Sequence, residues 1–62
     1  MPVITLDSSP LNQEQKRQLI GELTAVASKI THIPPQAFVV YLREHAKDNI
    51  GSGGVPLSEH KQ

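Results

Sequence analysis

The amino-acid sequence predicts an α+β domain made of one strand–helix–strand unit with a C-terminal hairpin. Three observations support this fold class: a β-branched run at the N-terminus, a helical apolar period through the middle, and a second apolar run before a glycine-rich tail. Sixty-two residues can form one small domain at most, so we expect residues 1–62 to be a single unit.

The first predicted element is a short strand over Pro2–Leu6, with the sequence PVITL. Its residues are apolar and mostly β-branched, which is typical of a buried strand. Residues 7–12 follow and combine turn-forming aspartate, serine and asparagine with Pro10, so we expect the strand to stop there.

The second predicted element is a long helix that begins after Asn12. Asn12 and Gln15 have the spacing of a capping box, in which each side chain bonds the other residue's backbone N–H. The helix should end near Ile33, because Pro34 and Pro35 cannot continue it. Its apolar residues form one stripe with a 3.6-residue period: Leu19, Ile20, Leu23, Val26, Ala27 and Ile30.

The third predicted element is a strand over residues 37–44, with the sequence AFVVYLRE, and the tail DNIGSGGVPL is suited to a hairpin. The two strands should be parallel and joined by a right-handed crossover. Two parallel strands are not a stable sheet alone, and both faces of the second strand carry apolar residues. We therefore expect the sheet to extend across a subunit boundary.

Composition excludes several other ways to stabilise so small a chain. There is no cysteine, and His32, His45 and His60 have no partner at zinc-site spacing, so neither disulfides nor a metal is expected. Formal net charge is zero, which argues against nucleic-acid and membrane partners. With no signal peptide or membrane-spanning run recognisable, we expect a cytoplasmic homo-oligomer.

Pro2 is the candidate catalytic residue. Methionine is usually trimmed before a small residue such as proline, and Pro2 would then carry a free secondary amine held by a strand. Burial in an apolar site lowers the pKa of an amine, and a neutral amine is a good general base. It could alternatively add to a carbonyl as a nucleophile, or Pro2 could be a purely structural residue.

Several motifs together resemble the 4-oxalocrotonate tautomerase (2-hydroxymuconate tautomerase) family: MP before a short strand, NQEQKRQLIGEL, REHAK and NIGSGG. The resemblance covers about residues 2–57. It implies the tautomerase (macrophage migration inhibitory factor-like) fold, with dimers that form hexamers. It also implies that Pro2 is the general base of a cofactor-free and metal-free keto–enol isomerisation of a 2-oxo acid.

The match to this family is uneven at the substrate-binding positions. The family commonly has arginines where this chain has Leu11 and Val39, so its usual dicarboxylate substrate is in doubt. Ile50 replaces an aromatic residue in the C-terminal loop and still supplies an apolar wall, with Ser52 beside it. We expect a monocarboxylate or less charged enol as substrate, with Arg43 as the best remaining cation.

Other interpretations stay open from the sequence. Arg43 could be a solvated charge at a strand end rather than a ligand. His45 and Glu44 could form an acid–base pair, although adjacent strand residues point to opposite faces. The chain could also be an oligomerising module that keeps the fold without the chemistry, or a decarboxylase or dehalogenase that uses the same proline.

Overall fold

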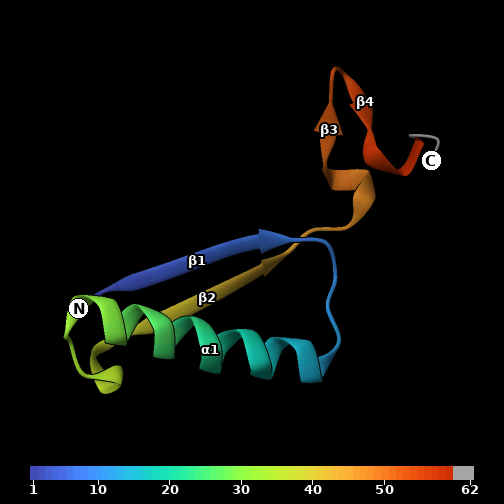
Figure 1. Ribbon diagram of the computed structural model, residues 1–62. Helices are drawn as coiled ribbons and strands as arrows, with labels where there is room; N and C mark the ends of the chain where they lie inside the picture. Colours follow the sequence, from blue (N-terminus) through green and yellow to red (C-terminus); the bar gives the residue numbers. More distant parts are fainter. Residues whose placement is uncertain (60–62) are drawn as a thin grey trace.

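The computed structural model describes residues 1–59 and confirms a strand–helix–strand unit followed by a hairpin (Figure 1). The elements are β1 (Val3–Ser8), α1 (Gln13–Thr31), the 3₁₀ turn η1 (Pro35–Ala37), β2 (Val39–Glu44), the 3₁₀ turn η2 (Lys47–Asn49), β3 (Gly51–Ser52), β4 (Val55–Pro56) and the 3₁₀ turn η3 (Leu57–Glu59).

The strands β1 and β2 are parallel, as predicted, with a register from Val3 opposite Val39 to Ser8 opposite Glu44. β1 is longer than the sequence indicated, because the register also includes Asp7, opposite Arg43. Pairing with a neighbouring strand therefore overrides the turn preference of the residues before Pro10.

The start of β2 also differs from the expected residue 37. Pro35–Ala37 form a 3₁₀ turn, in which the Ala37 N–H donates to the Pro34 carbonyl at 3.0 Å. Pro34 and Pro35 favour this turn because proline fixes φ and lacks a donor. The strand consequently begins two residues later, at Val39.

The predicted capping box begins α1. The Gln15 N–H donates to the Asn12 side chain at 2.8 Å, and the Asn12 N–H donates to the Gln15 side chain at 3.1 Å. The helix ends at Thr31 and is capped by His32, which adopts a left-handed conformation with φ of 61° and donates its N–H to the Ser28 carbonyl. These local bonds fix both ends of the crossover between the two strands.

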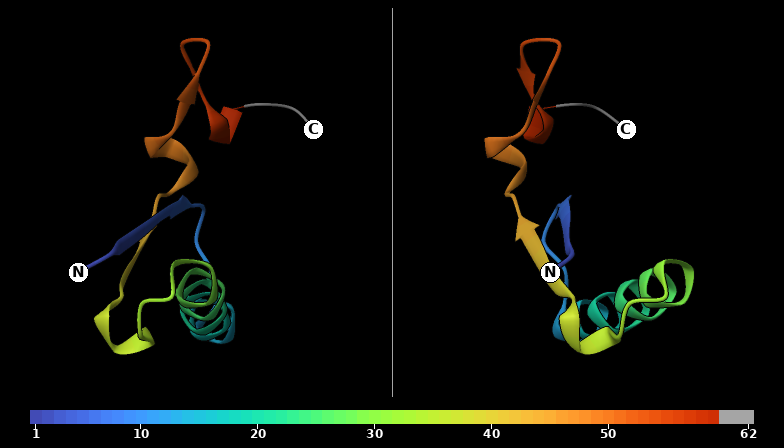
Figure 2. Two further views of the ribbon diagram at one scale, coloured as in Figure 1. Left: turned by 60° about the vertical axis from the view of Figure 1, so that its left-hand side comes forward. Right: turned by 90° about the vertical axis from the view of Figure 1, so that its left-hand side faces the viewer.

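The helix covers one face of the two-stranded sheet (Figure 2). Even-numbered strand residues lie on the helix side, where Ile4, Leu6, Val40 and Leu42 are half-buried. Odd-numbered residues lie on the uncovered face, where Val3 is 53% exposed and Tyr41 55%. The strands thus have one covered and one uncovered apolar face.

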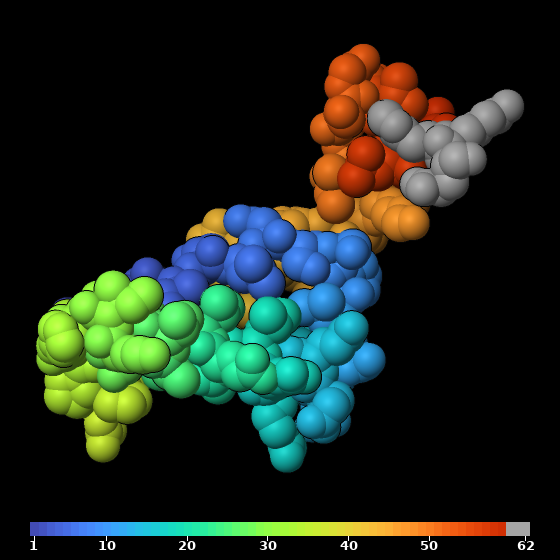
Figure 3. Space-filling view, viewed as in Figure 1, coloured from blue at the N-terminus to red at the C-terminus, as the bar shows by residue number. Residues whose placement is uncertain are grey.

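Residues 46–59 form a C-terminal arm that projects from the end of the sheet (Figures 1 and 3). β3 and β4 are antiparallel, which confirms the predicted hairpin. Gly53 and Gly54 occupy its turn with φ of 63° and 84°, the region that glycine adopts without steric cost. The arm is closed at its base by the Leu57 N–H, which donates to the Ile50 carbonyl at 2.7 Å.

The chain has no closed core of its own within residues 1–59, where no side chain is fully buried. The accessible surface is 4959 Å², against about 4,000 Å² for a compact protein of this mass. The radius of gyration is 14.9 Å, against about 10–11 Å for a compact domain of this length. Apolar surface that a core would bury is therefore still exposed.

Candidate active site

Pro2 lies directly before β1 and is tied to the sheet. Its carbonyl accepts a hydrogen bond from the Val39 N–H at 3.0 Å, which extends the parallel ladder by one residue. Pro2 is half-buried, whereas the preceding Met1 is 88% exposed. The backbone of Pro2 is thus held by rigid structure rather than by a free terminus.

The other predicted site residues lie away from Pro2 within one chain. Arg43 lies near the opposite end of β2, four residues or about 13 Å beyond Val39. Ile50 is half-buried and Ser52 exposed in the C-terminal arm, which extends from that same far end (Figures 1 and 2). A single chain therefore does not bring Arg43, Ile50 or Ser52 next to Pro2.

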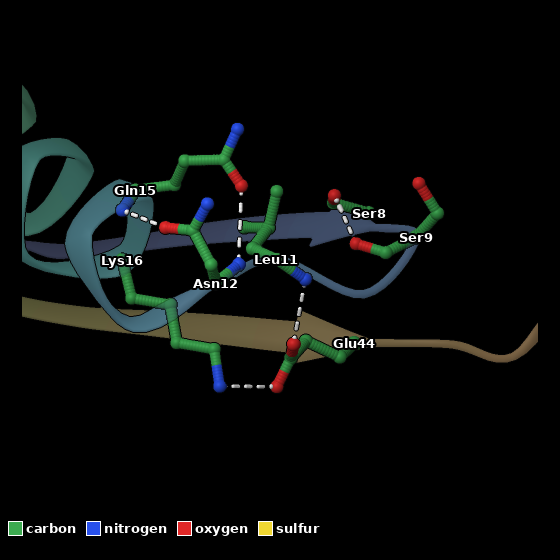
Figure 4. A network of polar contacts seen from close by, with 7 residues as sticks. All are labelled: Ser8, Ser9, Leu11, Asn12, Gln15, Lys16 and Glu44. Atoms are coloured by element: carbon green, nitrogen blue, oxygen red, sulfur yellow. Dashed lines mark hydrogen bonds and ion pairs between the residues drawn. The ribbon is translucent and has the colours of Figure 1, made fainter.

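The positions without the expected arginines have contrasting surroundings. Val39 lies on the uncovered sheet face, in line with Tyr41. Leu11 lies before the helix, where its backbone N–H donates to Glu44 Oε2 at 2.8 Å (Figure 4). An apolar side chain therefore occupies each position, and a carboxylate lies beside Leu11.

Glu44 connects the end of β2 to the start of α1 (Figure 4). In addition to the bond from Leu11, Glu44 Oε1 lies 2.8 Å from the Lys16 ammonium. The hydrogen bond from Lys16 and then that from Leu11 hold the pKa of the Glu44 carboxyl below its ordinary value. Lys16 is therefore part of a link between two elements.

A second polar pair lies at the carboxyl ends of the strands. His45 Nε2 is 2.8 Å from Asp7 Oδ1, and the His45 N–H donates to the Ser8 carbonyl at 2.8 Å. Sequence reasoning considered His45 only with its neighbour Glu44 and missed Asp7. The missing signal was the strand register, which places Asp7 opposite Arg43, two residues before His45.

A groove of about 530 Å³ lies along α1. Part of the apolar stripe of the helix is exposed there and beyond it, since Val26 is 50% exposed and Ile30 is 71% exposed. Only part of the predicted apolar stripe of the helix therefore packs against the sheet. The groove is lined by Leu11, Gln15, Gln18, Leu19, Glu22, Leu23 and Val26.

The described part of the chain offers no group of three side chains that could hold a metal ion. His60, one of the three histidines, lies outside the described residues. No helix within residues 1–59 combines the length and apolar character needed to cross a membrane.

Comparisons with known proteins agree with the fold. The chain matches the model of a family described as "Tautomerase enzyme" over residues 2–60. It is 33% identical over 60 residues to a "Probable tautomerase" of Bacillus cereus, covering 95% of this chain and 98% of the relative.

Solved structures are similar over nearly the whole chain. The crystal structure of a 4-oxalocrotonate tautomerase homologue is 30% identical, with complete coverage of both chains and a TM-score of 0.88. DmpI from Helicobacter pylori is 28% identical over 95% of this chain and 100% of its own, with a TM-score of 0.83. With its parallel strands, its anchored Pro2 and a family match over residues 2–60, the chain belongs to the tautomerase enzyme family and has a tautomerase-type function.

Proposed function

We propose that this protein interconverts the enol and keto forms of a 2-oxo acid, with the amine of Pro2 as general base. The anchoring of Pro2 at the start of β1 is the observation that carries the proposal. Once Met1 is removed, the proline ring and the bond from Val39 would aim a secondary amine in one direction.

The reaction needs only a proton to move. The neutral amine of Pro2 takes the proton from the enol hydroxyl as the carbonyl forms, and the resulting ammonium gives a proton to carbon. No electron leaves the substrate and the amine is regenerated, so a single base suffices without a cofactor. The amine must be uncharged to act, which an apolar environment favours by lowering its pKa.

The site would be completed by other copies of the chain. The arm that carries Ile50 and Ser52 extends from the end of the sheet opposite the N-terminus (Figures 1 and 2), so these residues would act on the Pro2 of a neighbouring subunit. The accessible surface exceeds that of a compact protein by about 1,000 Å², similar to the ~800 Å² that each partner buries in a typical interface. These features support a dimer-based homo-oligomer, which we propose to be a hexamer.

The substrate should carry one carboxylate rather than two. Binding a dicarboxylate strongly calls for fixed cations, and Leu11 and Val39 supply none. Arg43 remains as the cation for a single carboxylate, and Ile50 would contact the apolar part of the substrate. A conjugated 2-oxo monoacid such as phenylenolpyruvate fits this description better than 2-hydroxymuconate.

The decisive experiment compares protein with and without Met1. A retained Met1 makes the Pro2 nitrogen an amide, whose lone pair is delocalised and cannot accept a proton at ordinary pH. We expect the blocked protein to assemble normally but to lose about 10²–10⁴-fold in kcat/KM for phenylenolpyruvate, the usual contribution of general-base catalysis. Intact-mass spectrometry identifies each preparation, and ketonisation is followed by ultraviolet absorbance.

Two controls sharpen this comparison. Pro2→Ala should be milder than the block, because processing still exposes an amine that is less rigidly aimed. Equal activity with and without Met1 would show that Pro2 is not the base. Activity absent from every preparation would favour the rival function, an oligomerising module without catalysis, which the apolar residues Leu11 and Val39 also suit.

A further inference from the structure

The position of Ile50 in the C-terminal arm is set by hydrogen bonds rather than by a closed core. Ile50, Pro56 and Leu57 are half-buried, and the other residues of 46–59 are exposed. The Ile50 N–H donates to the Lys47 carbonyl at 3.3 Å, and the Ile50 carbonyl accepts from the Leu57 N–H at 2.7 Å. Ile50 therefore lies where it does because η2 and η3 are held next to each other.

A hydrogen bond between side chains joins these two turns. Ser58, in η3, donates its hydroxyl to Asp48 Oδ1, in η2, across ten positions of the sequence. Asp48 comes two residues before Ile50, and Ser58 directly follows Leu57. The bond between Asp48 and Ser58, which we call the clasp, thus reinforces the backbone bond between Leu57 and Ile50. A carboxylate acceptor makes such a bond stronger than one between neutral groups.

We propose that Asp48 and Ser58 are positioning residues for the reaction, and that the clasp holds Ile50 ready to contact the substrate. The role toward the substrate rests on the function proposed above, whereas the ordering of Ile50 by the clasp does not. A loop that is already held in its binding conformation does not lose conformational entropy when the ligand arrives. Pro2 lies in the body, so the clasp should act on KM and leave kcat unchanged.

The chain offers closely matched variants for a test. Ser58→Ala and Asp48→Ala each remove one partner of the clasp, whereas Asp48→Asn keeps an oxygen that can accept from Ser58. Ser9→Ala is the control, because it removes an exposed serine hydroxyl from the segment before α1 and leaves the arm intact.

The first measurement does not depend on activity. Amide hydrogen exchange of the Leu57 N–H is followed by NMR in the assembled protein, since this N–H donates to the Ile50 carbonyl. Ser58→Ala and Asp48→Ala should exchange about two- to fivefold faster than the wild type, the effect of losing one exposed hydrogen bond. Asp48→Asn and Ser9→Ala should exchange at the wild-type rate.

The second measurement is the enol assay with phenylenolpyruvate on the same variants after removal of Met1. Ser58→Ala should raise KM about two- to fivefold with kcat unchanged, and Asp48→Asn should restore the KM that Asp48→Ala loses. In a chain that already carries Ile50→Ala, Ser58→Ala should not raise KM further, because residues that act through one another have non-additive effects. Sedimentation confirms that each variant assembles like the wild type.

The outcomes separate this inference from the proposed function. Activity that depends on Pro2, with a wild-type KM in Ser58→Ala, would overturn the positioning role and keep the tautomerase function. An equal rise of KM with and without Ile50→Ala would also overturn it, because the clasp would then act elsewhere. Faster Leu57 exchange in a protein without tautomerase activity would refute the proposed function, and the role toward the substrate with it, but would show that the clasp orders Ile50.

Discussion

The strand–helix–strand body (residues 2–44) and the C-terminal arm (residues 46–59) are held together in different ways. In the body, contacts join distant parts of the sequence, as when Glu44 binds both Leu11 and Lys16. In the arm, the contacts are local, such as those of Ser58 with Asp48 and of Leu57 with Ile50. Contacts within residues 46–59 therefore give the arm a defined shape of its own.

This difference has a consequence for the proposed site. The body holds the candidate base, Pro2, and the arm holds the residues expected to contact the substrate, Ile50 and Ser52. Within one chain, the arm extends from one end of the sheet, and the N-terminus of the body lies at the other end (Figures 1 and 2). An arm that is stable in shape and extends into solvent is well suited to complete the site of a neighbouring subunit.

The largest expected effect comes from removing the arm. A chain shortened to residues 1–45 should form a smaller assembly than the 62-residue chain and should lose tautomerase activity, because the arm would both join subunits and complete their sites. The 62-residue chain should sediment as a multiple of a dimer, since burying its apolar surface contributes about 25 cal/mol per Å². Analytical ultracentrifugation at micromolar concentration measures both species.

Two outcomes would contradict the roles proposed for the body and the arm. A folded 6.8 kDa monomer of the 62-residue chain would show that the exposed apolar faces need no partner. An unchanged assembly after truncation would show that the body alone joins the subunits and that the arm acts only on the substrate.

Features that depend on neighbouring residues could be predicted from the sequence. The capping box of Asn12 and Gln15 is one example, because its bonds span three residues. The hairpin around Gly53 and Gly54 is another, because positive φ angles favour glycine wherever the turn occurs. The order and parallel pairing of the main strands followed from the length of the helical connection.

Features that depend on register or on other subunits could not be predicted in the same way. The extension of β1 to Ser8 and the pair of Asp7 with His45 both require knowing which residues of β2 lie opposite. The grouping of Pro2 with Arg43, Ile50 and Ser52 stays a prediction, because it depends on contacts between copies. Sequence patterns indicate which face of a strand or helix is apolar and where a turn occurs. They do not indicate which of these faces pack together.

A moderate effect is expected from a change in the arm alone. Ile50→Ala should raise KM for phenylenolpyruvate about tenfold with a smaller change in kcat, because it removes apolar contact with the substrate and leaves the base in place. Ser52→Ala, two residues away in the hairpin, should change KM less. Steady-state kinetics with sedimentation as a control for assembly measures both, and a kcat loss without a KM change would place Ile50 outside the substrate wall.

The smallest expected effect concerns the link between β2 and α1 in the body. The pKa of the Glu44 carboxyl is lowered by its bonds from Lys16 and Leu11, so the folded protein favours the ionised form. This contribution to stability is present above the ordinary glutamate pKa and is lost as the pH falls through the lower, folded-state pKa. Glu44→Gln should therefore melt at a slightly lower temperature than the wild type at pH 7, and the difference should shrink as the pH falls below about 4.5. Thermal melts at one protein concentration measure this difference in melting temperature. Glu59→Gln is the control, because it removes an acidic group from the arm and leaves Glu44 in place. A Glu44→Gln difference that stays constant down to pH 3 would mean that the carboxylate charge does not stabilise this link, and that the shape of the side chain alone does.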